Sequence, residues 1–397
     1  MSSSAEQMRK WQGPAILSYG FRPFFFLGAV WAALAMLLWV FMLAGLLDLP
    51  TAFDPVSWHA HALIFGYLPA IVTGFLLTAV PNWTGRLPVV GWPLGGLVGL
   101  WLLGRLAVSV SAVLPPVLTA LLDLSAPALL AGLMAREIIA GKNWRNLIVL
   151  GMLAVLILAD VIFHIEAAAG EYAPQGFGAR LGLGAGIMMI AVIGGRIVPS
   201  FTRNWLVKQG RKNLPVPPMQ KFDKAALLIL LAALLSWFAL PELILSGLLL
   251  LAAGGAHLIR LSRWSGVQTL ANPLLAVMHL AYFLLPLGAL MLGAAILLPG
   301  LLMPAAAQHI WMAGAIGLMT LAVMTRATLG HTGQPLAAGA ATVAIYAAVL
   351  ISVMARLAAG LLPEAATAFY HLSALGWIIG FAGFAMRYGP LLLTRTR

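Results

Sequence analysis

The chain has 397 residues, of which 62% are hydrophobic and only 9% are charged. Soluble domains carry about 25% charged residues, so this composition excludes a water-soluble globular protein and indicates a polytopic membrane protein. The absence of cysteine excludes disulfides, thiolate-ligated haem and cysteine-bound iron–sulfur clusters. A formal net charge of +12 would suit nucleic-acid binding, but basic cytoplasmic loops account for it in a membrane protein, so we predict no nucleic-acid partner.

Apolar runs of membrane length recur along the chain, and a bilayer core needs about 20 apolar residues per helix. They predict an all-α fold with twelve transmembrane helices. The predicted spans are residues 22–46, 57–80, 91–110, 115–136, 146–169, 178–201, 223–240, 242–261, 273–298, 305–327, 336–360 and 364–388. Residues 1–21 are then a cytoplasmic N-terminal segment, and residues 22–397 form a single transmembrane domain with a basic cytoplasmic loop at 204–224.

The distribution of Lys and Arg predicts the orientation of these spans. With the N-terminus inside, all but four of the 23 Lys and Arg residues fall in cytoplasmic segments, the exceptions being Arg105, Arg180, Arg196 and Arg356. Positive residues concentrate on the cytoplasmic side, so we predict that both termini are cytoplasmic. The loop at 204–224 is either a solvated linker or a surface for anionic lipid or a partner.

Similar sequences close three of the predicted spans. Span two ends in Val-Pro-Asn-Trp-Thr-Gly-Arg (80–86), span six in Val-Pro-Ser-Phe-Thr-Arg (198–203) and span ten, more loosely, in Val-Met-Thr-Arg (323–326). A recurrence of about 120 residues predicts a threefold repeat of four helices, with these three spans in equivalent positions. The alternative is that helix ends at one membrane face converge on the same residue types.

Two histidines, His59 and His61, stand at the head of the second span. A histidine inside a bilayer needs a partner for each ring nitrogen, and transition metals are among the best partners. Positions two apart point about 200° apart around an ideal helix, so both reach one point only if the helix start is irregular. We expect one to be a metal ligand and the other a neighbouring or interfacial residue; two interfacial histidines are the alternative.

Histidines of similar depth occur on three further spans. His164, His309 and His371 lie in the predicted outer half of the membrane, like His59 and His61. A common depth across four helices is what a metal or haem site in a bundle requires, because haem iron takes an axial ligand from each face. We predict these five histidines as metal ligands, and all of them except His164 as haem contacts.

Two charged residues extend this prediction. Asp160 lies one helical turn before His164, so its carboxylate can orient the imidazole of a ligand; a helix-internal ion pair is the alternative. Arg196, inside span six, either reaches the inner membrane surface or holds an anionic group such as a haem propionate. The other histidines are predicted to be structural: His257, His279 and, in a turn-rich loop at 325–333, His331.

Five segments carry a resemblance to a known family. They are Phe-Arg-Pro-Phe-Phe (21–25), Trp-His-Ala-His (58–61), Gly-Phe-Leu-Leu-Thr-Ala-Val-Pro-Asn-Trp-Thr-Gly (74–85), Gly-Gly-Arg-Ile-Val-Pro (194–199) and Arg-Ala-Thr-Leu-Gly-His-Thr-Gly (326–333). Together they resemble the NnrS family over nearly the whole chain. The block in span two is the most specific of the five.

The resemblance implies a twelve-span bacterial inner-membrane protein that contains haem and copper and serves the response to nitric oxide and nitrosative stress. The helix plan is also similar to the main subunit of haem–copper oxidases, where three four-helix arcs surround the metals. One position departs from the family pattern, because members typically carry Glu after the second histidine and this chain carries Ala62. The role of that carboxylate is lost here or has moved, with Asp54 and Asp160 as candidates.

Three functions fit these observations. The first is a haem and copper protein that binds nitric oxide, or detoxifies it by reduction, with an electron donor that the sequence does not identify. The second is a secondary transporter of a metal complex or small anion, for which twelve spans, basic cytoplasmic loops and repeats are equally usual. The third is a cofactor-assembly protein for a respiratory complex.

Overall fold

The computed structural model describes residues 11–84 and 88–395, in which the secondary structure is helical without any strand. Twelve helical segments of this described part are long and apolar enough to cross a membrane. The predicted all-α fold with twelve spans is therefore confirmed. Four of the basic residues used to predict the orientation lie outside the described residues: Arg9, Lys10, Arg86 and Arg397.

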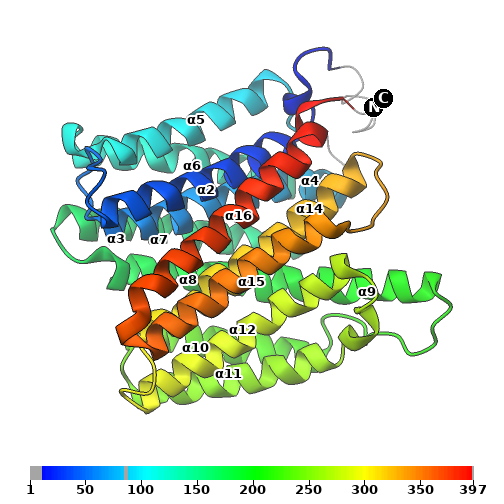
Figure 1. The fold of residues 1–397 in the computed structure, drawn as a ribbon. Helices are drawn as coiled ribbons and strands as arrows, with labels where there is room; N and C mark the ends of the chain where they lie inside the picture. The colour runs from blue at the N-terminus through cyan, green and yellow to red at the C-terminus, as the bar shows by residue number, and fades with distance from the viewer. Residues whose placement is uncertain (1–10, 85–87, 396–397) are drawn as a thin grey trace. The chain divides into compact units, whose positions relative to one another are not determined.

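Most spans are single α-helices joined by short loops (Figure 1). These helices are α2 (Phe21–Leu43), α5 (Trp92–Ser109), α6 (Pro116–Ala140), α7 (Leu147–Ala168), α10 (Lys221–Ala239), α11 (Ile244–Ser262), α12 (Pro273–Leu297), α15 (Ala340–Leu361) and α16 (Ala366–Leu393). The loops carry short 3₁₀ turns, η1 (Ala15–Ser18), η3 (Ser111–Val113), η4 (Trp144–Asn146), η5 (Ala173–Gln175), η7 (Gly266–Thr269) and η9 (Pro363–Ala365).

The second, sixth and tenth spans are different, because π-helical turns interrupt each of them. They are α3–η2–α4 (Pro55–His61, Ala62–Tyr67, Leu68–Thr84), α8–η6–α9 (Phe177–Met189, Ile190–Gly194, Gly195–Lys208) and α13–η8–α14 (Pro304–His309, Ile310–Leu318, Met319–His331). In their most apolar stretches 72–78% of the residues are buried, against 28–56% in the other nine spans. These are the three spans that end in similar sequences, so their shared interruption and burial favour the threefold repeat of four helices.

The chain divides into two compact units, residues 1–185, 331–333 and 381–397 in the first and residues 186–330 and 334–380 in the second. In the first unit α6 packs along both α5 and α7, and α2 packs along α4. In the second unit α11 packs along both α10 and α12, and the three helices run side by side in Figure 1. Each unit therefore has its own set of packed spans.

The predicted loop at 325–333 was wrong for most of its length, because α14 continues to His331. The hydroxyl of Thr325 donates to the carbonyl of Leu321 at 2.8 Å, four residues earlier, so the threonine bonds within the helix instead of opening a turn. The helix ends near Gly333, whose φ of +70° is the left-handed conformation that glycine adopts easily.

Candidate metal centre

The second span places its two histidines in different surroundings. Its first helix is started by Asp54, whose Oδ1 accepts two backbone N–H groups of the first turn at 2.9 and 3.0 Å. That helix lasts only to His61, where the π-helical turns begin. His61 is fully buried, whereas the ring of His59 stacks on Trp39 with the ring centroids 4.0 Å apart. The pair thus separates as the helical angle between positions two apart predicts.

The π-helical turns that follow His61 are held by two tryptophan side chains. Trp31 Nε1 donates to the carbonyl of Ala62 at 2.9 Å, and Trp101 Nε1 donates to the carbonyl of Gly66 at 3.0 Å. A π-helical turn leaves backbone groups out of the regular ladder, and inside a membrane such groups need another partner. The two indoles fix the turns and, with them, the position of His61.

The next two spans contribute a buried ion pair. Arg105 on α5 donates from Nη2 to Oδ1 of Asp123 on α6, and their side chains are 5% and 0% exposed. Two glycines make this approach possible: a Cβ at Gly104 would lie 2.9 Å from the Cα of Asp123, and a Cβ at Gly66 would overlap Nη1 of Arg105. The ion pair therefore packs directly against the π-helical turns, at positions where a larger residue does not fit.

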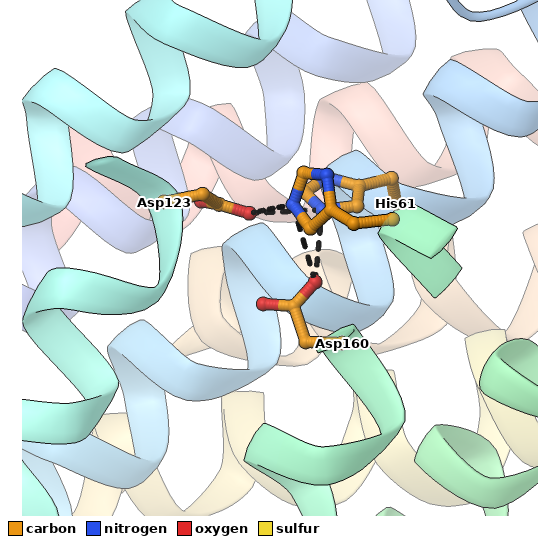
Figure 2. Close-up of side chains that lie close together, drawn as sticks. His61, Asp123 and Asp160 are labelled. Carbon is orange, nitrogen blue, oxygen red and sulfur yellow. Dashed lines mark hydrogen bonds and ion pairs between the residues drawn. The ribbon is translucent and has the colours of Figure 1, made fainter. Parts of the chain in front are cut away.

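Asp123 also contacts one histidine of the second span and one of the fifth span. His61 Nε2 lies 2.9 Å from Asp123 Oδ2 and 3.1 Å from Asp160 Oδ1 (Figure 2). His164 Nε2 lies 3.1 Å from the same Asp123 oxygen and 3.8 Å from Asp160 Oδ1. One donor atom from each of these four buried residues lies within 4.8 Å of every other. We call His61, Asp123, Asp160 and His164 the His–Asp cluster.

The His–Asp cluster has the composition and spacing of a metal site. Ligands about 2.1 Å from one ion in a tetrahedral arrangement are roughly 3.4 Å apart, and the four distances above lie around that value. Imidazole and carboxylate suit Cu(II), Zn(II) or Fe(II), whereas Cu(I) prefers sulfur. With neutral histidines the two carboxylates exceed the single Arg105 guanidinium by one negative charge, which a cation would compensate. A protonated His61 between the carboxylates is the metal-free alternative.

Three phenylalanine rings pack against the histidines of the cluster. The ring centroids of Phe53, Phe65 and Phe163 lie 5.6, 5.5 and 5.4 Å from that of His61. Phe53 also lies 5.9 Å from the ring of His164. In such a low-dielectric setting, charges interact more strongly than in water. The excess negative charge of the two carboxylates therefore has to be balanced, either by a bound cation or by protonation of His61. His61 Nδ1 finds no hydrogen-bond acceptor within the described part of the chain.

Three other predicted site residues belong to the second unit and are not members of the His–Asp cluster. His309 ends α13, and its Nδ1 donates to the carbonyl of Ala305 at 2.6 Å. His371 is exposed on α16. Arg196 is half-buried and immediately follows the π-helical turns of the sixth span, in α9. The structure thus joins His61 and His164 and leaves the haem contacts predicted on the second unit as predictions.

The structure also shows what three acidic residues of the first unit contact. Of the two proposed substitutes for the family Glu, Asp160 contacts His61, whereas Asp54 caps α3. Glu166 accepts the backbone N–H groups of Phe177 and Gly178 at 2.5 and 3.1 Å, so it holds the start of α8.

Asp123 was missed by the sequence analysis, although a signal for it was present. An acid in span four and the cation Arg105 in span three are opposite charges inside neighbouring apolar spans, and such charges usually pair.

Among models of protein families, the one described as "NnrS protein" matches residues 15–396 of the chain. The chain belongs to the NnrS family. This membership supports a role in the nitric oxide response. None of the curated proteins compared with this NnrS chain matches it.

Proposed function

We propose that this NnrS protein binds one transition metal ion, copper(II), at the His–Asp cluster and binds nitric oxide there as part of its role in the nitric oxide response. The observation that carries the proposal is the convergence of two imidazole nitrogens and two carboxylates, all buried, from three different spans. Such convergence costs desolvation of both acids, and a cation bound between them would offset that cost.

Each residue of the site has a task in this proposal. His61 and His164 would donate Nε2 lone pairs, and Asp123 and Asp160 one oxygen each. Arg105 holds Asp123 in place and neutralises one acid. The bound metal would supply a coordination position for nitric oxide, which is small and apolar enough to enter from lipid. The phenylalanine rings would exclude water from that position.

Haem is a separate part of the proposal and rests on other residues. A haem-ligating histidine usually donates its second ring N–H to a carbonyl, which fixes the tautomer that leaves a lone pair on the other nitrogen. His309 has this bond, to Ala305. We therefore favour His309 as a haem ligand, with His59, His371 and Arg196 as the further predicted contacts. Reduction of nitric oxide would also need an electron donor, so the geometry supports binding more directly than turnover.

Metal analysis of the purified protein tests the proposal. We expect about one copper per chain, and the loss of most of it in His61→Ala and His164→Ala. His331→Ala is the matched control, because it removes an exposed histidine that lies outside the cluster and is predicted to be structural. An optical spectrum of the same samples reports haem independently, and His309→Ala should alter only that spectrum. Absence of bound metal in the unaltered protein, or equal copper loss in all variants, would reject the metal site.

Family membership suggests a location in the bacterial inner membrane, and the charge distribution supports cytoplasmic termini, which fusion of reporter domains at either end would test. The secondary transporter is the rival function. Substrate flux into proteoliposomes by protein free of metal and haem would favour that function over ours.

A further inference from the structure

The second unit has an open groove of about 1010 Å³ at one end of its helices. Residues of α12 and α15 line its length, and the end of α11, η7 and part of the loop between α9 and α10 form its end. The lining along the two helices is mainly apolar and includes Pro273, Ala276, Val277, Leu280, Phe283, Val343, Ala347 and Leu350. Phe283 and Val343 are 37% and 43% exposed, so this apolar part is open along the spans.

The length of the apolar part matches one leaflet of a bilayer. On α12 the lining extends from Pro273, the first residue of the helix, to Phe283. Ten residues at 1.5 Å each are about 15 Å. The hydrocarbon core of a bilayer is about 30 Å thick, so one leaflet has the same depth. An apolar groove of this length, open along the spans, suits the acyl chain of a lipid.

The other end of the groove is polar, and part of the loop at 204–224 is fixed beside it. The backbone N–H of Val216 donates to the carbonyl of Arg263 at 3.1 Å, and Gln268 Nε2 donates to the carbonyl of Asn213 at 3.0 Å. All four residues line the groove, together with Ser262. The loop thus contributes to the place where the headgroup of a lipid would lie.

Positive charge is concentrated at this polar end. Arg211 and Lys212 are exposed and immediately precede the part of the loop that lines the groove. Residues 204–224 and 259–272 together contain seven Lys and Arg residues and a single acid, which is buried in an ion pair. Basic residues beside a membrane attract anionic lipid headgroups. The charge therefore complements a headgroup with a net negative charge.

We propose that the groove binds one anionic phospholipid, with an acyl chain along α12 and α15 and the phosphate beside Arg211 and Lys212. In the predicted orientation this end of α12 is cytoplasmic, which assigns the lipid to the cytoplasmic leaflet. A free phosphate would match the charge and leave the apolar walls uncovered. A zwitterionic lipid would cover the walls and leave the positive charge without compensation. The site uses no residue of the His–Asp cluster and does not depend on the metal.

Native mass spectrometry of the full-length protein with added dioleoylphosphatidylglycerol tests the proposal. We expect one molecule retained per chain, more tightly than dioleoylphosphatidylcholine, and no retention of glycerol 3-phosphate, which has no acyl chain. Replacing both Arg211 and Lys212 by Gln should weaken retention about 20-fold, because each charge contributes about fivefold. The double variant Lys142→Gln, Arg145→Gln is the matched control, since it removes two exposed cations on the same predicted side of the first unit.

A second pair of variants tests the apolar part. Ala347→Trp should fill the groove and abolish retention of the single lipid, because Ala347 lines it. Ala344→Trp is the control, since Ala344 is also exposed on α15 and does not line the groove.

Three results would overturn the proposal. They are equal retention of the two lipids, equal effects of the two double Gln variants, and equal effects of the two tryptophan variants. The melting temperature of each variant shows whether it is folded. If Ala347→Trp proves unfolded, the lipid comparison and the double Gln variants decide the question.

Discussion

Asp123 pairs with a cation and with two histidines, and the two roles can be separated. Its side chain is 0% exposed and that of Arg105 is 5% exposed, so either residue without the other is a buried charge without its counterion. Removing one partner of a buried pair costs about 3–5 kcal/mol, whereas replacing both by apolar residues is often nearly neutral. We therefore expect Asp123→Leu and Arg105→Met each to lose about 3–5 kcal/mol of unfolding free energy, and the double variant to regain most of it.

Metal content should follow a different pattern in the same three variants. Asp123→Leu and the double variant both lack one of the four donors, so both should lose metal, although only one of them is unstable. Arg105→Met keeps all four donors and should keep more metal than either. Unfolding by detergent titration gives the free energies, and elemental analysis gives the metal. A double variant as unstable as Asp123→Leu would refute the ion-pair account and would assign the stability to the histidine contacts.

Two further predictions concern the π-helical turns of the second span. Gly66→Ala would place a Cβ against Arg105 and should cost about 1–3 kcal/mol of unfolding free energy, whereas Gly96→Ala on α5 meets nothing within 4 Å and should be neutral or slightly stabilising; the same detergent titration compares them. Trp101→Phe leaves the carbonyl of Gly66 without its donor and should cost about 1–3 kcal/mol, while Trp92→Phe, at an exposed residue, should change little, and equal losses would contradict this role.

The number of spans could be predicted from the sequence because hydropathy is a property of each segment by itself. The pairing of Asp160 with His164 could also be predicted, since a separation of four residues on one helix fixes the geometry. Asp123 could not be placed in the site without knowing which faces of α6 and α7 meet. The π-helical turns escaped the sequence analysis for a similar reason, because one added residue changes the direction of His61 and leaves the hydropathy unchanged.

Interrupting a spanning helix leaves backbone carbonyls without their helical partner, which is energetically costly in a bilayer. The sixth span satisfies such a carbonyl with a different kind of donor from the second span. Arg260 Nη1 donates to the carbonyl of Ala191 within η6 at 2.8 Å, and its Nε donates to Asp223 Oδ1 at 2.9 Å. In the second span indoles satisfy the carbonyls, and the pair of Arg105 with Asp123 packs beside them. Both interrupted spans thus have a buried arginine–aspartate pair at their π-helical turns, although the residues that bond to the backbone differ. The similarity between these spans lies in the backbone carbonyls that need a donor, and the residues that supply the donor differ. A comparison of residue types alone therefore detects the repeat only at the helix ends.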